Sequence, residues 1–312
     1  MRAATTGTRS SDRPPEPRRA TTAALRELSF ASVMATGIVS VACAELGLHV
    51  LSWTFAALAF ALYATVGVAA VVHRSLGPTG AGAFAAVAAT AVLGSRLAIA
   101  GVGDAAWAFL AAAFVVWLCV WAALLPTLEL GPPTGTRLLT TVATESLAIL
   151  AAATTRSLAP FAVAAFVLGV LLYPWTLAQL PRSELRTGGG DVWIAMGALA
   201  ISTLAAALLA RQLGGDALRD VAFALWAAAT AWLPVLGFAE LRRPWLGFHP
   251  TRWSTVFPLG MYAAASAEVA RLGLSGALTD DARVFLAVAI GAWLLTSAGL
   301  CASHSGRADT SA

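Results

Sequence analysis

Charged side chains are scarce in this chain of 312 residues, of which 12% are charged and 59% are hydrophobic. Soluble domains carry roughly 25% charged residues, so this deficit argues against an ordinary soluble domain. Lysine is absent, and all twenty cationic residues are arginine. The net charge of +4 has its largest concentration in a short N-terminal stretch rather than on an extended basic face. We therefore expect no nucleic-acid partner.

Motifs for metal binding and catalysis are also lacking. The three cysteines are far apart and form no CxxC pair, which indicates neither a disulfide framework nor a metal site; we expect buried structural thiols at Cys43, Cys119 and Cys301. The four histidines lie at the ends of apolar runs, outside any HExxH pattern. We expect no cofactor, no bound metal and no enzymatic activity.

The dominant feature is a series of apolar runs of about 20 residues, each long enough to cross a hydrocarbon core of roughly 30 Å. The sequence predicts an all-α integral membrane protein with one ten-helix domain over 27–303. A polar tail over 1–26, rich in proline and arginine, is expected to be disordered, and 304–312 form a second short tail. The predicted spans are 28–47, 50–72, 80–100, 104–125, 138–155, 158–179, 191–210, 218–239, 252–271 and 282–302.

The distribution of arginine predicts the orientation in the membrane. Fourteen arginines fall in the two tails and in the connections on the same side as the tails. Five lie on the opposite side, at positions 156, 211, 219, 271 and 283, and Arg96 lies within a span. Both termini are therefore expected in the cytoplasm, in a multi-pass protein of the inner (plasma) membrane.

Aromatic residues divide the spans into two classes. The even-numbered spans hold nineteen aromatic residues and the odd-numbered spans hold six. The odd spans instead collect small residues and four ionisable ones: Glu45, Arg96, Glu145 and Glu268. Large aromatics suit a lipid-facing surface, and buried charges must face protein or water. This pattern predicts five helical hairpins, with the odd helices forming an inner ring around a central pore. Chance variation in the aromatic counts is the alternative.

Three stretches carry a family resemblance: FASVMATGIVSVA (30–42), LLTTVATESLAIL (138–150) and RWSTVFPLGMYAAAS (252–266). Together they resemble the tellurite-resistance/dicarboxylate transporter family, which includes malate permeases, sulfite efflux pumps and slow-type anion channels. The resemblance implies a small anionic substrate, odd helices around a central pore and assembly as a homotrimer.

The same resemblance assigns a role to one residue. In the channel branch, a phenylalanine of the ninth helix plugs the pore after a WSFSF-like stretch, and that position in WSTVF is Phe257. This chain departs from the pattern at Thr255 and Pro258, and FPLGMY is closer to the dicarboxylate-carrier branch. A strict plug and one side of a transport constriction both remain open for Phe257 and Pro258.

Helical geometry places other candidates beside Phe257. Glu268 lies eleven residues further on, three turns away and only about 20° off the same face, with Gly260 and Ala264 between. Such a stripe fits either a pore wall or tight helix packing with Glu268 near Arg271. Thr36 and Gly37 of the first span fit the same two roles.

Two ionisable residues of inner spans remain. Glu145 is a candidate for a proton-coupling or gating group, and Arg96 is a candidate for the charge that attracts an anion. A structural Arg96–Glu145 pair between two inner helices is the alternative.

These observations predict transport of anions across the lipid bilayer, above all C4-dicarboxylates such as malate, through a pore constricted at Phe257. An uncoupled small-anion channel and a sulfite- or tellurite-related exporter are the alternatives within transport. An intramembrane enzyme or a structural assembly subunit is the alternative outside it.

Overall fold

A computed structural model describes residues 29–72, 80–126, 134–181, 192–242, 249–273 and 276–309. Across these ranges the chain forms ten α-helices, in agreement with the ten predicted. The predicted tail over 1–26 lies outside the described residues. The helices are α2 (Phe30–Glu45), α3 (His49–Val72), α4 (Phe84–Ile99), α5 (Gly103–Leu124), α6 (Leu139–Thr154), α7 (Ala159–Leu177), α9 (Trp193–Leu213), α10 (Asp216–Arg242), α11 (Trp253–Arg271) and α12 (Ala277–Asp309).

Short 3₁₀ turns lead into four of these helices. They are η2 (Gly80–Ala83) before α4, η3 (Gly135–Leu138) before α6, η4 (Arg156–Leu158) before α7 and η6 (Pro250–Arg252) before α11. The last helix begins five residues earlier and ends seven residues later than the predicted span 282–302. The other helices begin and end close to the predicted limits.

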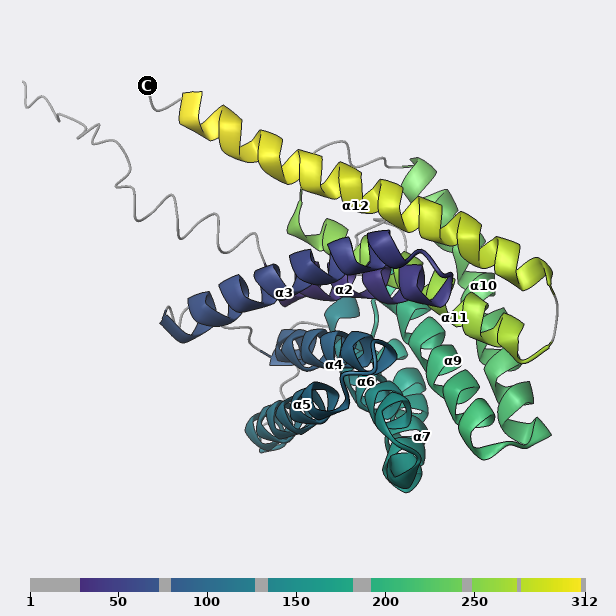
Figure 1. Ribbon diagram of the computed structural model, residues 1–312. Coiled ribbons are helices and arrows are strands. Elements are labelled where there is room, and N and C mark those ends of the chain that lie inside the picture. The colour runs from purple at the N-terminus through teal and green to yellow at the C-terminus, as the bar shows by residue number, and fades with distance from the viewer. Residues whose placement is uncertain are drawn as a thin grey trace, which may run out of the picture.

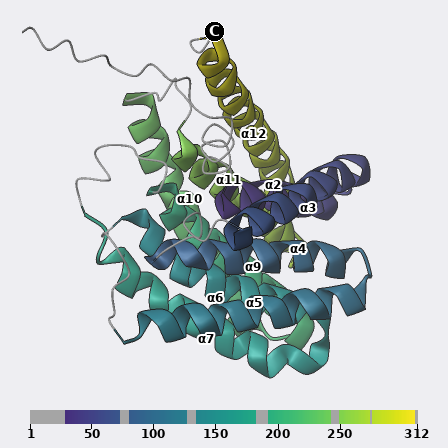
Figure 2. The same cartoon turned by 90° about the vertical axis from the view of Figure 1, so that its left-hand side faces the viewer.

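The helices pair into five hairpins, α2–α3, α4–α5, α6–α7, α9–α10 and α11–α12, and each first member belongs to an inner ring. The ring closes in the order α2, α4, α6, α9, α11 and back to α2, because each of these helices contacts the next. The two ribbon views show α12 lying along one side of the bundle next to α2 and α3 (Figure 1, Figure 2). The predicted arrangement of odd helices inside and even helices outside is therefore confirmed.

Burial separates the two classes of helix as the aromatic counts predicted. The inner helix α9 is almost entirely buried, whereas the outer helices α5, α10 and α12 expose most of their residues. Nearly all large exposed apolar side chains lie on the outer helices or at helix ends, for example Trp53, Trp107 and Trp175. An exposed apolar belt of this kind suits a lipid environment.

The cysteines correct one expectation. Cys43 on the inner helix α2 is buried as expected, but Cys119 on α5 and Cys301 on α12 are exposed. Both exposed thiols lie on outer helices, whose apolar surface accommodates a weakly polar thiol without burial inside the protein.

Seven of the described helices are long and apolar enough to cross a membrane by length and composition. The other three belong to the inner ring. Two of them, α2 and α6, have 16 residues each, which span about 24 Å. The third, α11, carries Glu268 and Arg271. Because the outer helices surround them, these inner helices need less apolar surface of their own.

Glycines set the distance between neighbouring inner helices. A Cβ added at Gly37 of α2 would lie 2.9 Å from Val92 Cγ1 on α4, and one added at Gly260 of α11 would lie 2.9 Å from Ile38 Cγ2 on α2. Gly94 of α4 meets Leu150 of α6 in the same way, and Gly197 of α9 meets Pro258 of α11. Small residues allow this close approach in membrane proteins.

We predict that Gly94→Ala destabilises the protein by about 1–3 kcal/mol, the usual cost of overpacking a core. The added Cβ would lie 2.7 Å from Leu150 Cδ2 and 2.8 Å from Phe109 Cβ. Thermal unfolding in detergent measures the effect. The control is Gly67→Ala on α3, where no atom lies within 4 Å of the added Cβ. Equal melting temperatures for the two variants would contradict the close packing at Gly94.

Candidate functional site

A small cavity lies at the centre of the inner ring. All five inner helices contribute to its wall, which consists of Ile38, Val41, Val92, Ser95, Ser146, Ile149, Ile201, Leu204 and Met261. Its volume is about 20 Å³, enough for roughly one water molecule. The inner ring is therefore closed at this level to any solute larger than water.

The wall is mostly aliphatic, and its two hydroxyls are already engaged. Ser95 Oγ donates to the carbonyl of Ala91 at 2.9 Å, and Ser146 Oγ donates to the carbonyl of Val142 at 2.7 Å. None of the lining residues carries a charge. The surface of the cavity is therefore apolar, and it holds no fixed ionic site.

Phe257 lies on α11 one turn before Met261, and it is buried. Four residues correspond to about 6 Å along the helix and about 40° around it. Phe257 is thus on nearly the same face as a cavity residue, toward the start of α11. Pro258, the next residue, packs against Gly197 of α9, where an added Cβ would lie 2.9 Å from the proline Cγ.

The predicted pore-lining residues lie around the cavity rather than in its wall. Thr36 accepts a hydrogen bond from Trp293 Nε1 of the outer helix α12 at 2.9 Å. Gly37 and Gly260 lie at the α2–α4 and α11–α2 contacts. Ala264 is fully buried one turn beyond Met261. Met261, Ser95 and Ser146 line the cavity but are not among the residues predicted from the sequence, although Met261 lies on the helix face shared by Phe257 and Glu268.

Glu145 points away from the cavity. Its Oε1 accepts a hydrogen bond from Ser202 Oγ of α9 at 3.0 Å. The same carboxyl group covers Gly169 of α7, where an added Cβ would lie 2.5 Å from Oε1. Among the described residues, Oε2 has no hydrogen-bond partner. The carboxyl group is fully buried between α6, α7 and α9, while its neighbour Ser146 faces the cavity.

Arg96 also points away from the cavity, toward the α2–α3 hairpin. Its Nε donates to Ser52 Oγ at 2.9 Å and to Ser40 Oγ at 3.2 Å. Its guanidinium lies over the ring of Trp53, 4.1 Å from the centroid, within the range of a cation–π interaction. The side chain is therefore fixed by hydroxyls and an aromatic ring.

An Arg96–Glu145 ion pair, one of the expected arrangements, is absent from the described part of the chain. Arg96 lies twelve residues into α4, whereas Glu145 lies six residues into α6. Because these inner helices run in the same direction, the two residues differ in depth by about 9 Å.

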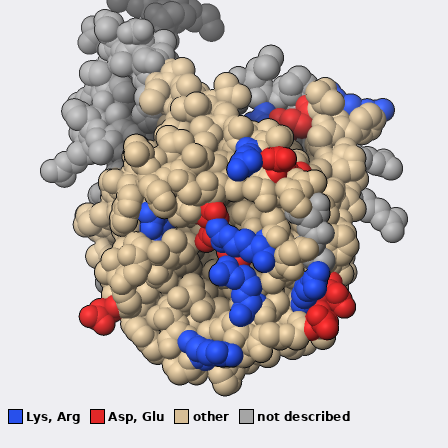
Figure 3. Space-filling view, turned by 45° about the vertical axis from the view of Figure 1, so that its right-hand side comes forward, with Lys and Arg blue, Asp and Glu red and all other residues tan. Residues whose placement is uncertain are grey.

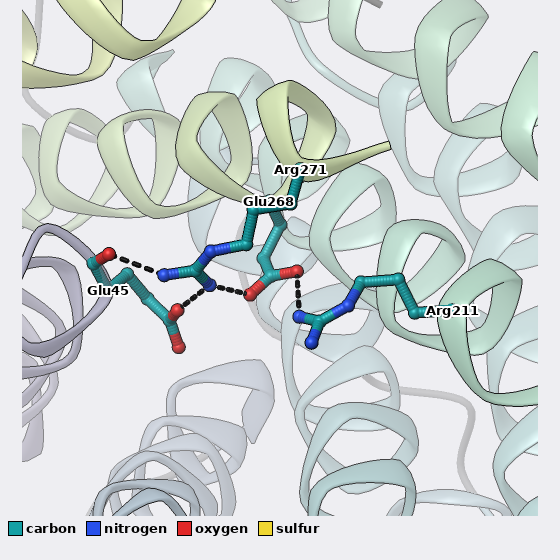
Figure 4. Close-up of polar contacts among 4 residues, drawn as sticks. All are labelled: Glu45, Arg211, Glu268 and Arg271. Atoms are coloured by element: carbon teal, nitrogen blue, oxygen red, sulfur yellow. Dashed lines mark hydrogen bonds and ion pairs between the residues drawn. The ribbon is translucent and has the colours of Figure 1, made fainter. Parts of the chain in front are cut away.

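Four charged residues form a network where the inner helices end. Glu268 accepts hydrogen bonds from two arginines, on Oε2 from Arg211 Nη1 at 2.6 Å and on Oε1 from Arg271. Arg271 also donates to the carboxylate and the backbone carbonyl of Glu45. The close-up shows these side chains reaching toward one another from α2, α9 and α11 (Figure 4). The network thus links three of the five inner helices.

The network lies above the cavity on the same helix faces. Glu45, Arg211 and Glu268 each follow a cavity residue, Ile38, Leu204 and Met261 respectively, by seven residues. Seven residues correspond to about 10 Å of rise and return to within about 20° of the same face. In the space-filling view, basic and acidic side chains lie side by side in the middle of the face shown (Figure 3). Charged groups therefore lie about two helical turns from the cavity, where the inner helices end.

A ring of five buried helices, an apolar outer surface and a small cavity to which all five helices contribute are typical of a polytopic membrane protein of the channel or transporter class. Comparison with protein families identifies the family to which the chain belongs. Residues 28–301 match the model of SLAC1, voltage-dependent anion channel, and the chain belongs to this family. The family's members are anion channels and transporters rather than enzymes. No curated protein matches the chain.

We predict that Arg96→Lys destabilises the protein by roughly 1–3 kcal/mol, because lysine cannot reproduce the Nε contacts to Ser40 and Ser52 or stack as a plane on Trp53. Thermal unfolding in detergent measures the loss. The control is Arg283→Lys, whose pair with Asp280 is exposed and contributes below about 1 kcal/mol. If Arg96→Lys unfolds at the wild-type temperature, these contacts contribute nothing to stability.

Proposed function

We propose that the protein carries C4-dicarboxylates such as malate across the inner (plasma) membrane, through the central passage of each subunit. The single observation behind this proposal is the cavity to which all five inner helices contribute, in a chain of an anion-channel family. The motif FPLGMY, which resembles the dicarboxylate-carrier branch, supports the choice of substrate.

Transport requires the passage to widen. A cavity of about 20 Å³ holds roughly one water molecule, so no dicarboxylate fits the present arrangement. Phe257 and Met261, the large side chains on one face of α11, are the groups whose displacement would open it. Pro258 weakens the helix at this point by removing a backbone donor, and it contacts Gly197 of α9. We propose that this Pro258–Gly197 contact lets α11 shift against α9.

Small residues set the width of the passage in this mechanism. Gly37 and Gly260 bring α2 against α4 and α11, and Thr36 fixes α2 to the outer helix α12 through Trp293. Ala264 leaves space on the stripe between Met261 and Glu268. We propose that these positions keep the inner walls close enough for one ring to close the passage.

The assembly and orientation are also part of the proposal. Fourteen arginines on the side of the tails support cytoplasmic termini. The charged network of Glu45, Arg211, Glu268 and Arg271 would then lie at the outer end of the passage. The apolar faces of the outer helices provide surfaces for a homotrimer within the bilayer.

One observation favours a second candidate, an uncoupled channel for small anions. The cavity wall carries no charged side chain, so it holds no fixed partner for the second carboxylate of a dicarboxylate. A sulfite- or tellurite-related exporter belongs to the same candidate class. Glu145 is the group that would couple flux to protons, because it is a fully buried carboxyl on an inner helix.

We predict that purified protein in liposomes carries malate faster than chloride or sulfite, because FPLGMY resembles the carrier branch. Flux of the three anions is compared with and without an imposed proton gradient. Faster malate flux supports the dicarboxylate proposal, and faster chloride flux supports the channel. No flux of any of these anions above that of empty liposomes would contradict both.

We predict that Phe257→Ala increases the flux of every permeant anion several-fold, because it removes the ring next to the narrowest part of the passage. The same liposome assay measures the change. The control is Phe223→Ala, which removes a half-exposed ring from the outer helix α10. Unchanged flux in Phe257→Ala, or an equal increase in Phe223→Ala, would show that Phe257 is not the constriction.

A further inference from the structure

The charged network at the end of the passage already contains a bound carboxylate. Two guanidiniums from different helices hold the carboxylate of Glu268, Arg211 on one oxygen and Arg271 on the other. The fork of an arginine matches the geometry of a carboxylate better than any other side chain. The occupant of this site is a carboxylate of the protein itself.

The side chains of Arg211 and Arg271 are accessible to solvent, although the Glu268 carboxylate that they bind is buried. The side chains of Arg211 and Arg271 are 47% and 38% exposed, whereas the Glu268 side chain is 1% exposed. Within the network, the atoms that a solute can reach therefore belong mainly to the guanidinium groups. A solute can contact them before either glutamate moves.

The direction of the inner helices makes cations necessary at this end. All five finish here, and each helix C-terminus carries roughly half a negative elementary charge. Uncompensated, these ends would repel an anion at the mouth of its own passage. Three of the five helices carry an arginine in the last turn, namely Arg96 of α4, Arg211 of α9 and Arg271 of α11. Arg96 is engaged by Ser40, Ser52 and Trp53, which leaves Arg211 and Arg271 for a solute.

We propose that Arg211 and Arg271 bind a carboxylate group of the permeant anion, which displaces Glu268 and Glu45 from them. This inference rests on the proposed function and adds a binding site to it. The incoming carboxylate takes the place of two carboxylates of the protein, so the ion pairs it gains are offset by the pairs that Glu268 and Glu45 lose, and the anion is held weakly enough to leave. Conduction requires binding of that kind. From this site the cavity lies about two helical turns away along the same faces.

A purely structural network predicts different behaviour. If the four residues only fasten the ends of α2, α9 and α11, their loss lowers thermal stability and maximal flux together. The concentration of anion that gives half-maximal flux then stays the same. If the arginines bind the anion, the half-saturating concentration changes. Removing a positive charge raises it, and removing a negative charge lowers it.

The experiment measures malate flux into liposomes against malate concentration for wild type, Arg211→Gln, Arg271→Gln and Glu268→Gln. Each arginine variant is expected to raise the half-saturating concentration roughly tenfold, since it loses a charge-assisted hydrogen bond. Glu268→Gln is expected to lower it, because a competing carboxylate is gone. Since that variant acts in the opposite direction, a general loss of folding cannot imitate the pattern.

The control is Arg283→Gln, which removes one positive charge at the start of α12, near the same end of the bundle. Arg283 pairs with the exposed Asp280 at 2.9 Å and does not contact the network. Its half-saturating concentration is expected to match wild type. An unchanged half-saturating concentration in the three network variants, or an equal change in Arg283→Gln, would overturn the anion site alone. A wild type without flux of any anion would overturn the proposed function and this site with it.

Discussion

Close contact between inner helices is the constraint on which the rest of this structure depends. Four of the five contacts around the ring pass over a glycine that has no room for a Cβ: Gly37 between α2 and α4, Gly94 between α4 and α6, Gly197 between α9 and α11, and Gly260 between α11 and α2. In lipid, burying apolar surface provides little drive for helices to associate, so the contacts that close approach permits must supply it. A ring drawn together this tightly leaves a central volume of only about 20 Å³.

The architecture could be predicted because it depends on composition averaged over whole helices. Nineteen aromatic residues on the even spans and six on the odd spans reflect which helices contact lipid, and burial divides the helices in the same way. Small residues on the inner helices reflect the same cause, since a closed ring excludes bulk from its contacts. Such averages tolerate errors of a few residues at each helix end, such as the later end of α12.

The site could be predicted only where the relative positions of residues on a single helix were sufficient. The eleven-residue step from Phe257 to Glu268 is fixed by helical geometry, and Met261 lies on that stripe in the cavity wall. Contacts between helices could not be predicted in this way. Pairing Arg96 with Glu145 would have required the relative depth of α4 and α6 and the direction in which each side chain points. The sequence contains no signal for either. The contact of Arg271 with Glu45 joins residues 226 positions apart, and no periodicity relates them.

The position of the charges follows from the narrowness of the ring. A guanidinium in the wall of a passage this small would hold an anion strongly in a low dielectric and would itself need a buried partner. Arg96 illustrates the alternative, since its side chain turns away from the cavity to hydroxyls and a tryptophan ring. At the end of the passage, where Arg211 and Arg271 reach water, the same charge costs less and can exchange partners. In the proposed mechanism, an uncharged wall and a charged end separate attraction of the anion from its passage. Each requirement is then met by different residues.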